Sequence, residues 1–70
     1  MKNKIKQFIK QNDITEMENG SVEWIEMVIY VTGFEGDESD FFEAMENDEA
    51  PEFDALLAEE ILDELGVEVF

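Results

Sequence analysis

The chain has 70 residues and a formal net charge of −16 at neutral pH, and it contains no cysteine and no histidine. This length accommodates one domain, so a single acidic domain is expected over residues 1–70. The two missing residue types exclude a disulfide framework, a thiolate metal site and the usual histidine general base. All four basic residues lie within the first ten positions, whereas all 20 acidic residues follow from Asp13 onward.

The segment over residues 2–11 predicts an amphipathic helix that Asn12-Asp13 ends. Ile5, Phe8 and Ile9 recur at the spacing of one helical face, so they form an apolar stripe. A neighbouring face carries a lysine at every fourth position (Lys2, Lys6 and Lys10). Since these few lysines stand against 20 carboxylates, direct nucleic-acid binding is not expected. We expect the lysine stripe to fold back on the acidic body and relieve its repulsion.

The next stretch, about 14–32, predicts a β-hairpin. Ile14–Glu18 is a short strand candidate, and the following Asn19-Gly20 is typical of a type I′ turn, because both turn positions need φ > 0. Ser21–Thr32 is rich in Val, Ile, Trp and Tyr, which favour strands. Both faces of this strand would be apolar. We therefore expect it to be central in the sheet, to be packed by other elements on both faces, or to bind a partner with part of one face. One face would carry Ile25, Met27, Ile29 and Val31, and the other Val22, Trp24, Val28 and Tyr30.

A short helix is expected over about 38–46, after the loop Gly33–Gly36. Asp37 or Ser39 can cap its first turn, because both side chains accept hydrogen bonds from free backbone N–H groups. Its inward-facing residues would be Phe41, Phe42 and Met45.

A last helix is expected over about 51–65, and residues 67–70 can add a short strand. Pro51 suits the first helical turn, and Gly66 is a natural stop. The buried side of this helix would carry Phe53, Leu57, Ala58, Ile61, Leu62 and Leu65. Together the elements predict an α+β fold in which a small antiparallel sheet is packed by two or three helices.

Carboxylates are spaced regularly along several of these elements. On the last helix Glu59 and Asp63 would lie about 6 Å apart along the axis, and Glu16 and Glu18 would lie about 6.6 Å apart on one face of the hairpin. A DNA strand carries a phosphate about every 3.4 Å of axis, so such arrays suit lysine and arginine groups placed for phosphates. Spacing alone does not single out DNA, and a solvated acidic face is the alternative. The candidate partner-binding carboxylates are Glu16, Glu18, Asp40, Glu43, Glu52, Glu59, Glu60, Asp63 and Glu64.

Trp24 and Tyr30 are two further candidates for partner binding. With Val22 and Val28 they would line the second face of the expected sheet. If a helix covers that face, the two rings belong to the core. If it does not, they form a patch suited to a homodimer or to an aromatic hot spot.

Other classes of function receive little support. The segment from Asp37 fails the EF-hand pattern, because Phe41 stands at a ligand position and no glycine occupies the sixth position. Chance carboxylate pairs such as Asp37 and Asp40 do not indicate catalysis in so short a chain, so neither an enzyme nor a cofactor is expected. Acyl carrier proteins resemble the chain in size and charge, but Glu38 and Asp40 flank Ser39 where that family has Asp and Leu.

No apolar run approaches the roughly 20 residues that span a bilayer, and the N-terminus lacks a signal-peptide pattern. No membrane partner is expected, and the expected location is the cytoplasm, that of the host cell if the protein is phage-encoded.

In size, acidity and lack of catalytic residues, the chain resembles the small acidic DNA-mimic inhibitors of phages and plasmids, which include anti-restriction and anti-CRISPR proteins. Gly20–Glu26 and Asp40–Ala44 are also similar to segments of the ArdA anti-restriction family; no site residue is carried over from that family. The resemblance implies a protein that occupies the DNA-binding groove of a nuclease, a CRISPR effector or another host DNA-binding protein.

The sequence therefore predicts an inhibitor whose partner is a basic DNA- or RNA-binding protein. One alternative is an acidic protein–protein interaction module, either an antitoxin-like neutraliser of another basic partner or an adaptor that docks through Trp24 and Tyr30. Adaptation to high salt is a third hypothesis, which the lysine-, asparagine- and isoleucine-rich N-terminal helix fits poorly.

Overall fold

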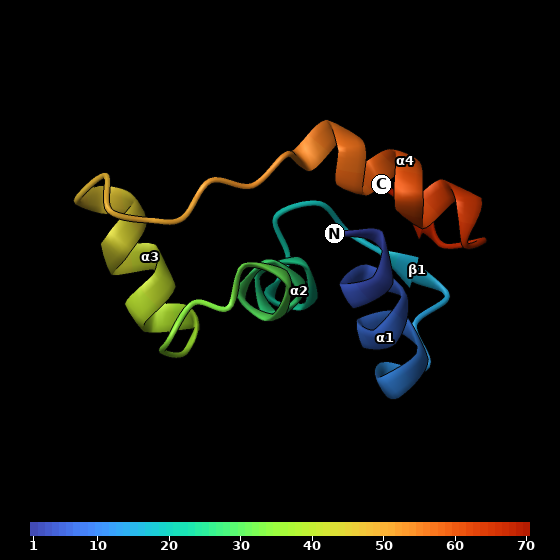
Figure 1. Ribbon diagram of the computed structural model, residues 1–70, viewed down its shortest axis with the longest axis horizontal. Coiled ribbons are helices and arrows are strands. Elements are labelled where there is room, and N and C mark those ends of the chain that lie inside the picture. Colours follow the sequence, from blue (N-terminus) through green and yellow to red (C-terminus); the bar gives the residue numbers. More distant parts are fainter.

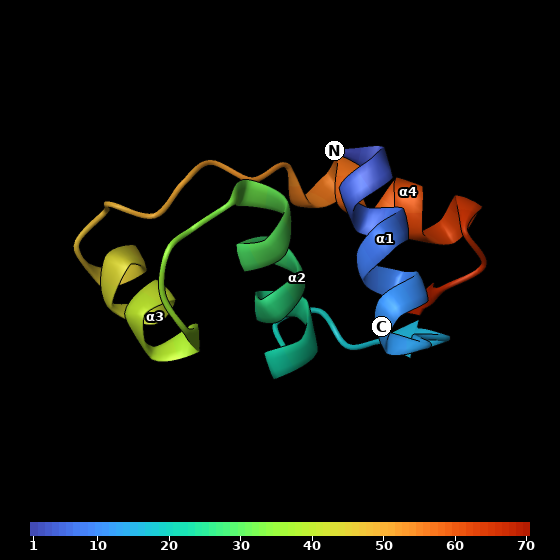
Figure 2. The ribbon, with the colours of Figure 1, turned by 60° about the horizontal axis from the view of Figure 1, so that its bottom comes forward.

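The computed structural model describes residues 1–70 and contains four helices and a two-stranded sheet (Figure 1). In chain order the elements are α1 Lys2–Asn12, β1 Glu16–Met17, α2 Val22–Thr32, α3 Glu38–Glu46, α4 Ala55–Glu64 and β2 Glu68–Val69. Helix α2 lies in the middle, with α1, α4 and the sheet on one side of it and α3 on the other (Figures 1 and 2). The molecule is elongated as a result, with extents of 34 × 22 × 20 Å.

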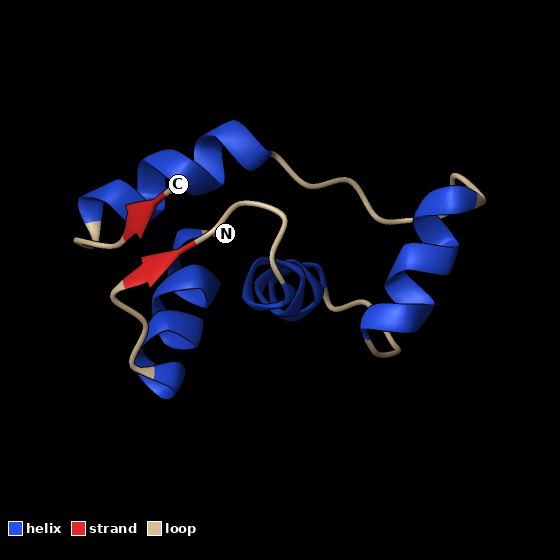
Figure 3. Ribbon diagram, turned by 180° about the vertical axis from the view of Figure 1, so that it is seen from behind, coloured by secondary structure: helices blue, strands red, loops and turns tan.

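The sheet is parallel, so the expected antiparallel sheet with a hairpin over 14–32 is wrong (Figure 3). Strand β1 pairs with β2 in the register Glu16 to Glu68 and Met17 to Val69. Parallel strands need a connection of a dozen residues or more, and α2, α3 and α4 supply it here. The strand expected over residues 67–70 is confirmed at Glu68–Val69.

The segment expected as a long second strand is helix α2. Ser21 Oγ accepts a hydrogen bond from the Trp24 backbone N–H at 3.2 Å and so caps the first turn. At the other end Gly33 adopts a φ of 74°, a left-handed conformation that glycine reaches without steric penalty. The apolar side chains therefore project around a helix instead of alternating across a strand, and they pack against α1 on one side and α3 on the other. The buried residues of α2 are Trp24, Ile25, Met27 and Val28.

Helices α1 and α3 are confirmed close to their expected bounds. Helix α1 runs one residue further than expected, to Asn12, and Asp13 closes it with a φ of 50°. Asp37, and not Ser39, caps α3: its side chain accepts from the Asp40 N–H at 3.0 Å. The Asp40 side chain in turn accepts from the Asp37 N–H at 3.2 Å, which completes a capping box.

Helix α4 begins four residues later than expected, at Ala55 rather than residue 51. The reason is a local cap that the sequence analysis overlooked. The Asp54 side chain accepts a hydrogen bond from the Leu57 N–H at 3.1 Å, so residues 51–54 lie outside the helix. Glu52 therefore does not share a helical face with Glu59 and Asp63.

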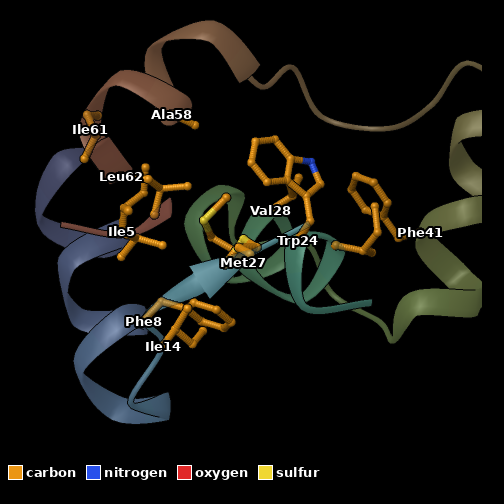
Figure 4. Close-up of a cluster of buried hydrophobic side chains, with 13 residues drawn as sticks. Ile5, Phe8, Ile14, Trp24, Met27, Val28, Phe41, Ala58, Ile61 and Leu62 are labelled. Carbon is orange, nitrogen blue, oxygen red and sulfur yellow. The ribbon is translucent and has the colours of Figure 1, made fainter. Parts of the chain in front are cut away.

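The core is one cluster of 13 buried residues that reaches from α1 and α4 across α2 to α3 (Figure 4). Ile5 of α1 and Leu62 of α4 meet at one end, and Trp24 of α2 and Phe41 of α3 lie at the other (Figure 4). This single cluster ties the four helices together, although α3 packs mainly against α2.

Three side chains expected to point inward are exposed instead. Phe42 and Met45 of α3 are 48% and 52% exposed, because α3 packs mainly on one neighbour and buries only Phe41. Leu57 of α4 is 42% exposed, and Phe53 and Leu65 are half-buried. The remaining predictions for α4 are confirmed, since Ala58, Ile61 and Leu62 are buried.

Candidate partner-binding surface

Phe70 presents an exposed aromatic ring beside the sheet. Its backbone N–H donates a hydrogen bond to the Met17 carbonyl at 3.0 Å, and its carbonyl accepts one from the Asn19 N–H at 2.8 Å. These bonds continue the pairing of β1 with β2 by one residue. The backbone of Phe70 is therefore held in place even though 64% of the residue is exposed.

Two shallow hollows flank the Phe70 ring. The Asn19 side-chain amide donates to Glu59 Oε1 at 2.6 Å and so fixes that carboxylate in the wall of the first hollow. This first hollow, of about 270 Å³, is lined by Asn19, Glu59, Asp63, Val67, Val69 and Phe70. The second, of about 490 Å³, is lined by Glu16, Met17, Glu18, Ser21, Val22, Glu23, Glu26 and Phe70.

The walls of the two hollows carry six carboxylates and no basic side chain. They come from β1 and the residue that follows it, from the first half of α2 and from the middle and end of α4, so the fold brings together three separate parts of the chain. We call these six residues the acidic strip: Glu16, Glu18, Glu23, Glu26, Glu59 and Asp63.

The lysines lie on α1 and leave the acidic strip unneutralised. The single ion pair of the structure joins Lys2 Nζ to Glu64 Oε2 at 3.0 Å, and both side chains are more than half exposed. An exposed pair of this kind contributes about 0–1 kcal/mol. We expected the whole lysine stripe to pair with the acidic body, but only Lys2 does so. Its partner, Glu64, lies outside the acidic strip.

Several carboxylates stand where they lower the stability of the fold. Glu16 lies directly opposite Glu68 in the parallel register, and like charges in such a position repel. Asp63 and Glu64 lie in the last turn of α4, which holds no basic residue. Negative charge at a helix C-terminus is unfavourable by about 0.3–1 kcal/mol. Stability does not explain these placements.

Glu26 shows how tightly the negative charges are packed. A side-chain hydrogen bond with Glu38 raises the pKa of Glu26, and partial burial and the charges of Glu38 and Glu23 raise it further. The hydrogen bond requires a proton on one of the two carboxyl groups. Since Glu26 belongs to α2 and Glu38 begins α3, the two helices place like charges against each other across their interface.

The structure brings together four of the nine carboxylates that the sequence analysis singled out. Glu16, Glu18, Glu59 and Asp63 belong to the acidic strip. The other five lie outside it: Asp40 and Glu43 on α3, Glu52 in the segment before α4, and Glu60 and Glu64 on α4.

The two aromatic candidates, Trp24 and Tyr30, do not form an exposed docking patch. Trp24 is 6% exposed, and its ring packs edge-on against Phe53 with centroids 6.1 Å apart. Tyr30 is half-buried against Phe8, and its hydroxyl donates to Gln7 Oε1 at 3.0 Å. Trp24 is thus a core residue, and the exposed aromatic ring beside the acidic strip is that of Phe70.

Glu23, Glu26 and Phe70 belong to this surface but were not among the candidates predicted from the sequence. Reading residues 22–32 as a strand concealed that Glu23 and Glu26, three residues apart, share the outer face of a helix. The cap residues Ser21 and Gly33 were the signal for that helix. The position of Phe70 depends on the pairing of β1 with β2. This pairing sets Glu16 opposite Glu68, 52 residues later in the chain, and no local sequence pattern encodes it.

Comparison of the chain with protein-family models, curated proteins and solved structures found no match. None of the four helices combines the length and apolar character needed to cross a lipid bilayer. No three acidic side chains are grouped closely enough to hold a metal ion.

Proposed function

We propose that the protein is a stoichiometric inhibitor that occupies the nucleic-acid-binding cleft of a basic protein, such as a nuclease or a CRISPR effector. The observation that carries this proposal is the acidic strip. Six carboxylates line the two hollows that share one exposed aromatic residue, Phe70, and no basic side chain neutralises them.

The chemistry of the strip matches that of a nucleic-acid ligand in two respects. Its carboxylates offer the negative oxygen atoms that lysine and arginine side chains would otherwise bind on phosphates. The Phe70 ring offers a flat apolar face, and the guanidinium group of an arginine stacks favourably on such a face. A cleft built for a nucleic acid contains both kinds of basic contact.

Binding by this surface is governed by long-range attraction. With a net charge of −16, the protein is drawn to a basic cleft before contact, so association is fast at low salt and slows as salt is added. No chemical step is involved in the proposed inhibition, and no cofactor is required. The target is blocked for as long as the complex persists.

The proposal is tested by capture and displacement. The protein is immobilised, exposed to a bacterial lysate and washed, and duplex DNA is then added at constant ionic strength. We expect the DNA to release a nuclease or a CRISPR effector, identified by mass spectrometry, and we expect capture to weaken as salt rises. Capture that neither salt nor DNA diminishes contradicts the proposal, and recovery of one small basic toxin supports the antitoxin-like alternative.

A further inference from the structure

A third hollow, of different character, lies between α2 and α3, on the side of α2 opposite to the sheet. Its volume is about 230 Å³, and seven of its eight lining residues are hydrophobic. Trp24 of α2, Phe41 and Met45 of α3, and Ala50 and Phe53 of the following segment form its walls. We call it the apolar hollow.

The walls of the apolar hollow are held by packed rings. Phe53 meets Trp24 edge-on at a centroid distance of 6.1 Å, and Phe41 meets Phe34 edge-on at 5.2 Å. Trp24 and Phe41 are both buried and line the hollow from α2 and α3. Because these contacts position both helices, the hollow exists before any ligand arrives.

The rim of the hollow carries apolar surface that this chain leaves uncovered. Met45 lines the hollow and is nevertheless 52% exposed. Methionine is unbranched and polarisable, so its side chain adapts to differently shaped apolar partners. The hollow and its rim together fit one large apolar side chain.

Charge identifies the kind of molecule that can bring this side chain. Residues 37–54, which form α3 and the segment after it, contain nine acidic and no basic residues. A second copy of the chain would bring a further charge of −16 to this surface, so it would be repelled. A segment rich in lysine or arginine is attracted instead.

We propose that the apolar hollow anchors a single large apolar side chain, such as Phe or Leu, presented by a basic segment of the protein partner. This inference rests on the proposed function in so far as that function makes the partner basic. The hollow adds to the charge attraction a contact that depends on shape and on apolar burial.

The test uses two synthetic peptides of alternating lysine and alanine that differ at one central position, Phe in the first and Ala in the second. Binding to the intact protein is measured by isothermal titration calorimetry. We expect the Phe peptide to bind roughly tenfold more tightly, the gain that burial of one large apolar side chain provides. In methyl NMR spectra, the Met45 and Ala50 signals should shift with the Phe peptide and stay in place with the Ala peptide.

Two variants test whether the difference in affinity between the Phe and Ala peptides arises in the apolar hollow. Ala50→Phe fills the hollow and should abolish the preference for the Phe peptide, while affinity for the Ala peptide is retained. Ala55→Phe makes the same change at an exposed position outside the hollow and should keep the preference. If Ala50→Phe does not fold, the NMR shifts of the unaltered protein decide the question.

The outcomes separate this inference from the function on which it rests. Equal affinity of the two peptides, with binding that salt weakens, overturns the apolar hollow alone. Absence of binding by either peptide overturns both proposals. A dimer of the free protein in analytical ultracentrifugation that Ala50→Phe dissociates shows a second copy in the hollow, and this result also overturns the inference.

Discussion

At the scale of single residues, the clearest trace of charge crowding is the raised pKa of Glu26. A carboxyl group whose pKa is higher in the folded state binds its proton more tightly there than in the unfolded chain. Its contribution to stability is present below the ordinary value of 4.5 and is lost as pH rises through the raised value. Folding is therefore penalised at neutral pH at this position.

Glu26→Gln should relieve that penalty, because its amide group donates to the Glu38 carboxylate at every pH. We expect the variant to exceed the unaltered protein in unfolding free energy at pH 7, by about 0.5 kcal/mol as for exposed charge pairs. The two proteins should be equally stable near pH 4. Urea denaturation at both pH values measures the difference, with Glu43→Gln on the outer face of α3 as control. Parallel pH profiles for Glu26→Gln and the unaltered protein would contradict the assignment.

Gly36 makes a second prediction at the residue scale. It adopts a φ of 144°, and an added Cβ would lie 2.8 Å from the Asp40 Cβ atom in the first turn of α3. Gly33 also has a positive φ, but no atom lies within 4 Å of its added Cβ. Gly36→Ala should therefore destabilise the protein by more than Gly33→Ala, for which about 1 kcal/mol is expected. Equal losses in thermal unfolding would show that the close approach to Asp40 is unimportant.

At the scale of elements, side-chain caps fix where α2, α3 and α4 begin. Ser21→Ala removes the side-chain acceptor for the Trp24 N–H and should cost about 1 kcal/mol of stability. Ser39→Ala is the matched control, because Ser39 lies inside α3 and caps nothing. Circular dichroism during thermal unfolding compares the two. Similar unfolding temperatures for both variants would contradict the role of Ser21.

Helices α1 and α3 could be predicted because their local signals agree. In α1 the apolar spacing matches a helical face, and in α3 Asp37 provides a strong cap. Helix α2 could not be assigned from residue preference, since its Val, Ile, Trp and Tyr residues favour strands. Burial of these side chains against α1 and α3 outweighs that preference here, and a twelve-residue strand would have been unusually long.

The candidate surface was predictable only in part, for a physical reason. The carboxylates of α4 and those near β1 were visible as charged positions in the sequence. Their convergence on Phe70 depends on parallel pairing between strands at opposite ends of the chain, which tertiary packing determines. The same holds for the apolar hollow, whose walls come from α2, α3 and the segment before α4.

At the scale of the whole molecule, the charge distribution predicts a strong effect of salt on stability. The shorter extents are 22 and 20 Å, so at about 10 mM salt, where the Debye length is about 30 Å, carboxylates repel one another across the molecule. At about 150 mM the Debye length falls to about 8 Å. We therefore expect the melting temperature to rise by several degrees over this range, equally in NaCl and KCl.

A melting temperature independent of salt would show that repulsion is a minor term. Absence of folded protein at low salt would instead support adaptation to high salt, the hypothesis that the sequence of α1 fits poorly.

The most direct measurement of the central claim compares two variants of equal charge for affinity to the captured partner. One neutralises part of the acidic strip by isosteric substitution: Glu16→Gln, Glu18→Gln, Glu59→Gln and Asp63→Asn. The other neutralises as many exposed carboxylates outside both the acidic strip and residues 37–54: Asp13→Asn, Glu35→Gln, Glu60→Gln and Glu64→Gln. If the arrangement around Phe70 is what a basic cleft recognises, the first variant should lose roughly tenfold or more in affinity and the second far less. Equal losses would mean that only total charge matters, and the proposed recognition surface would be wrong.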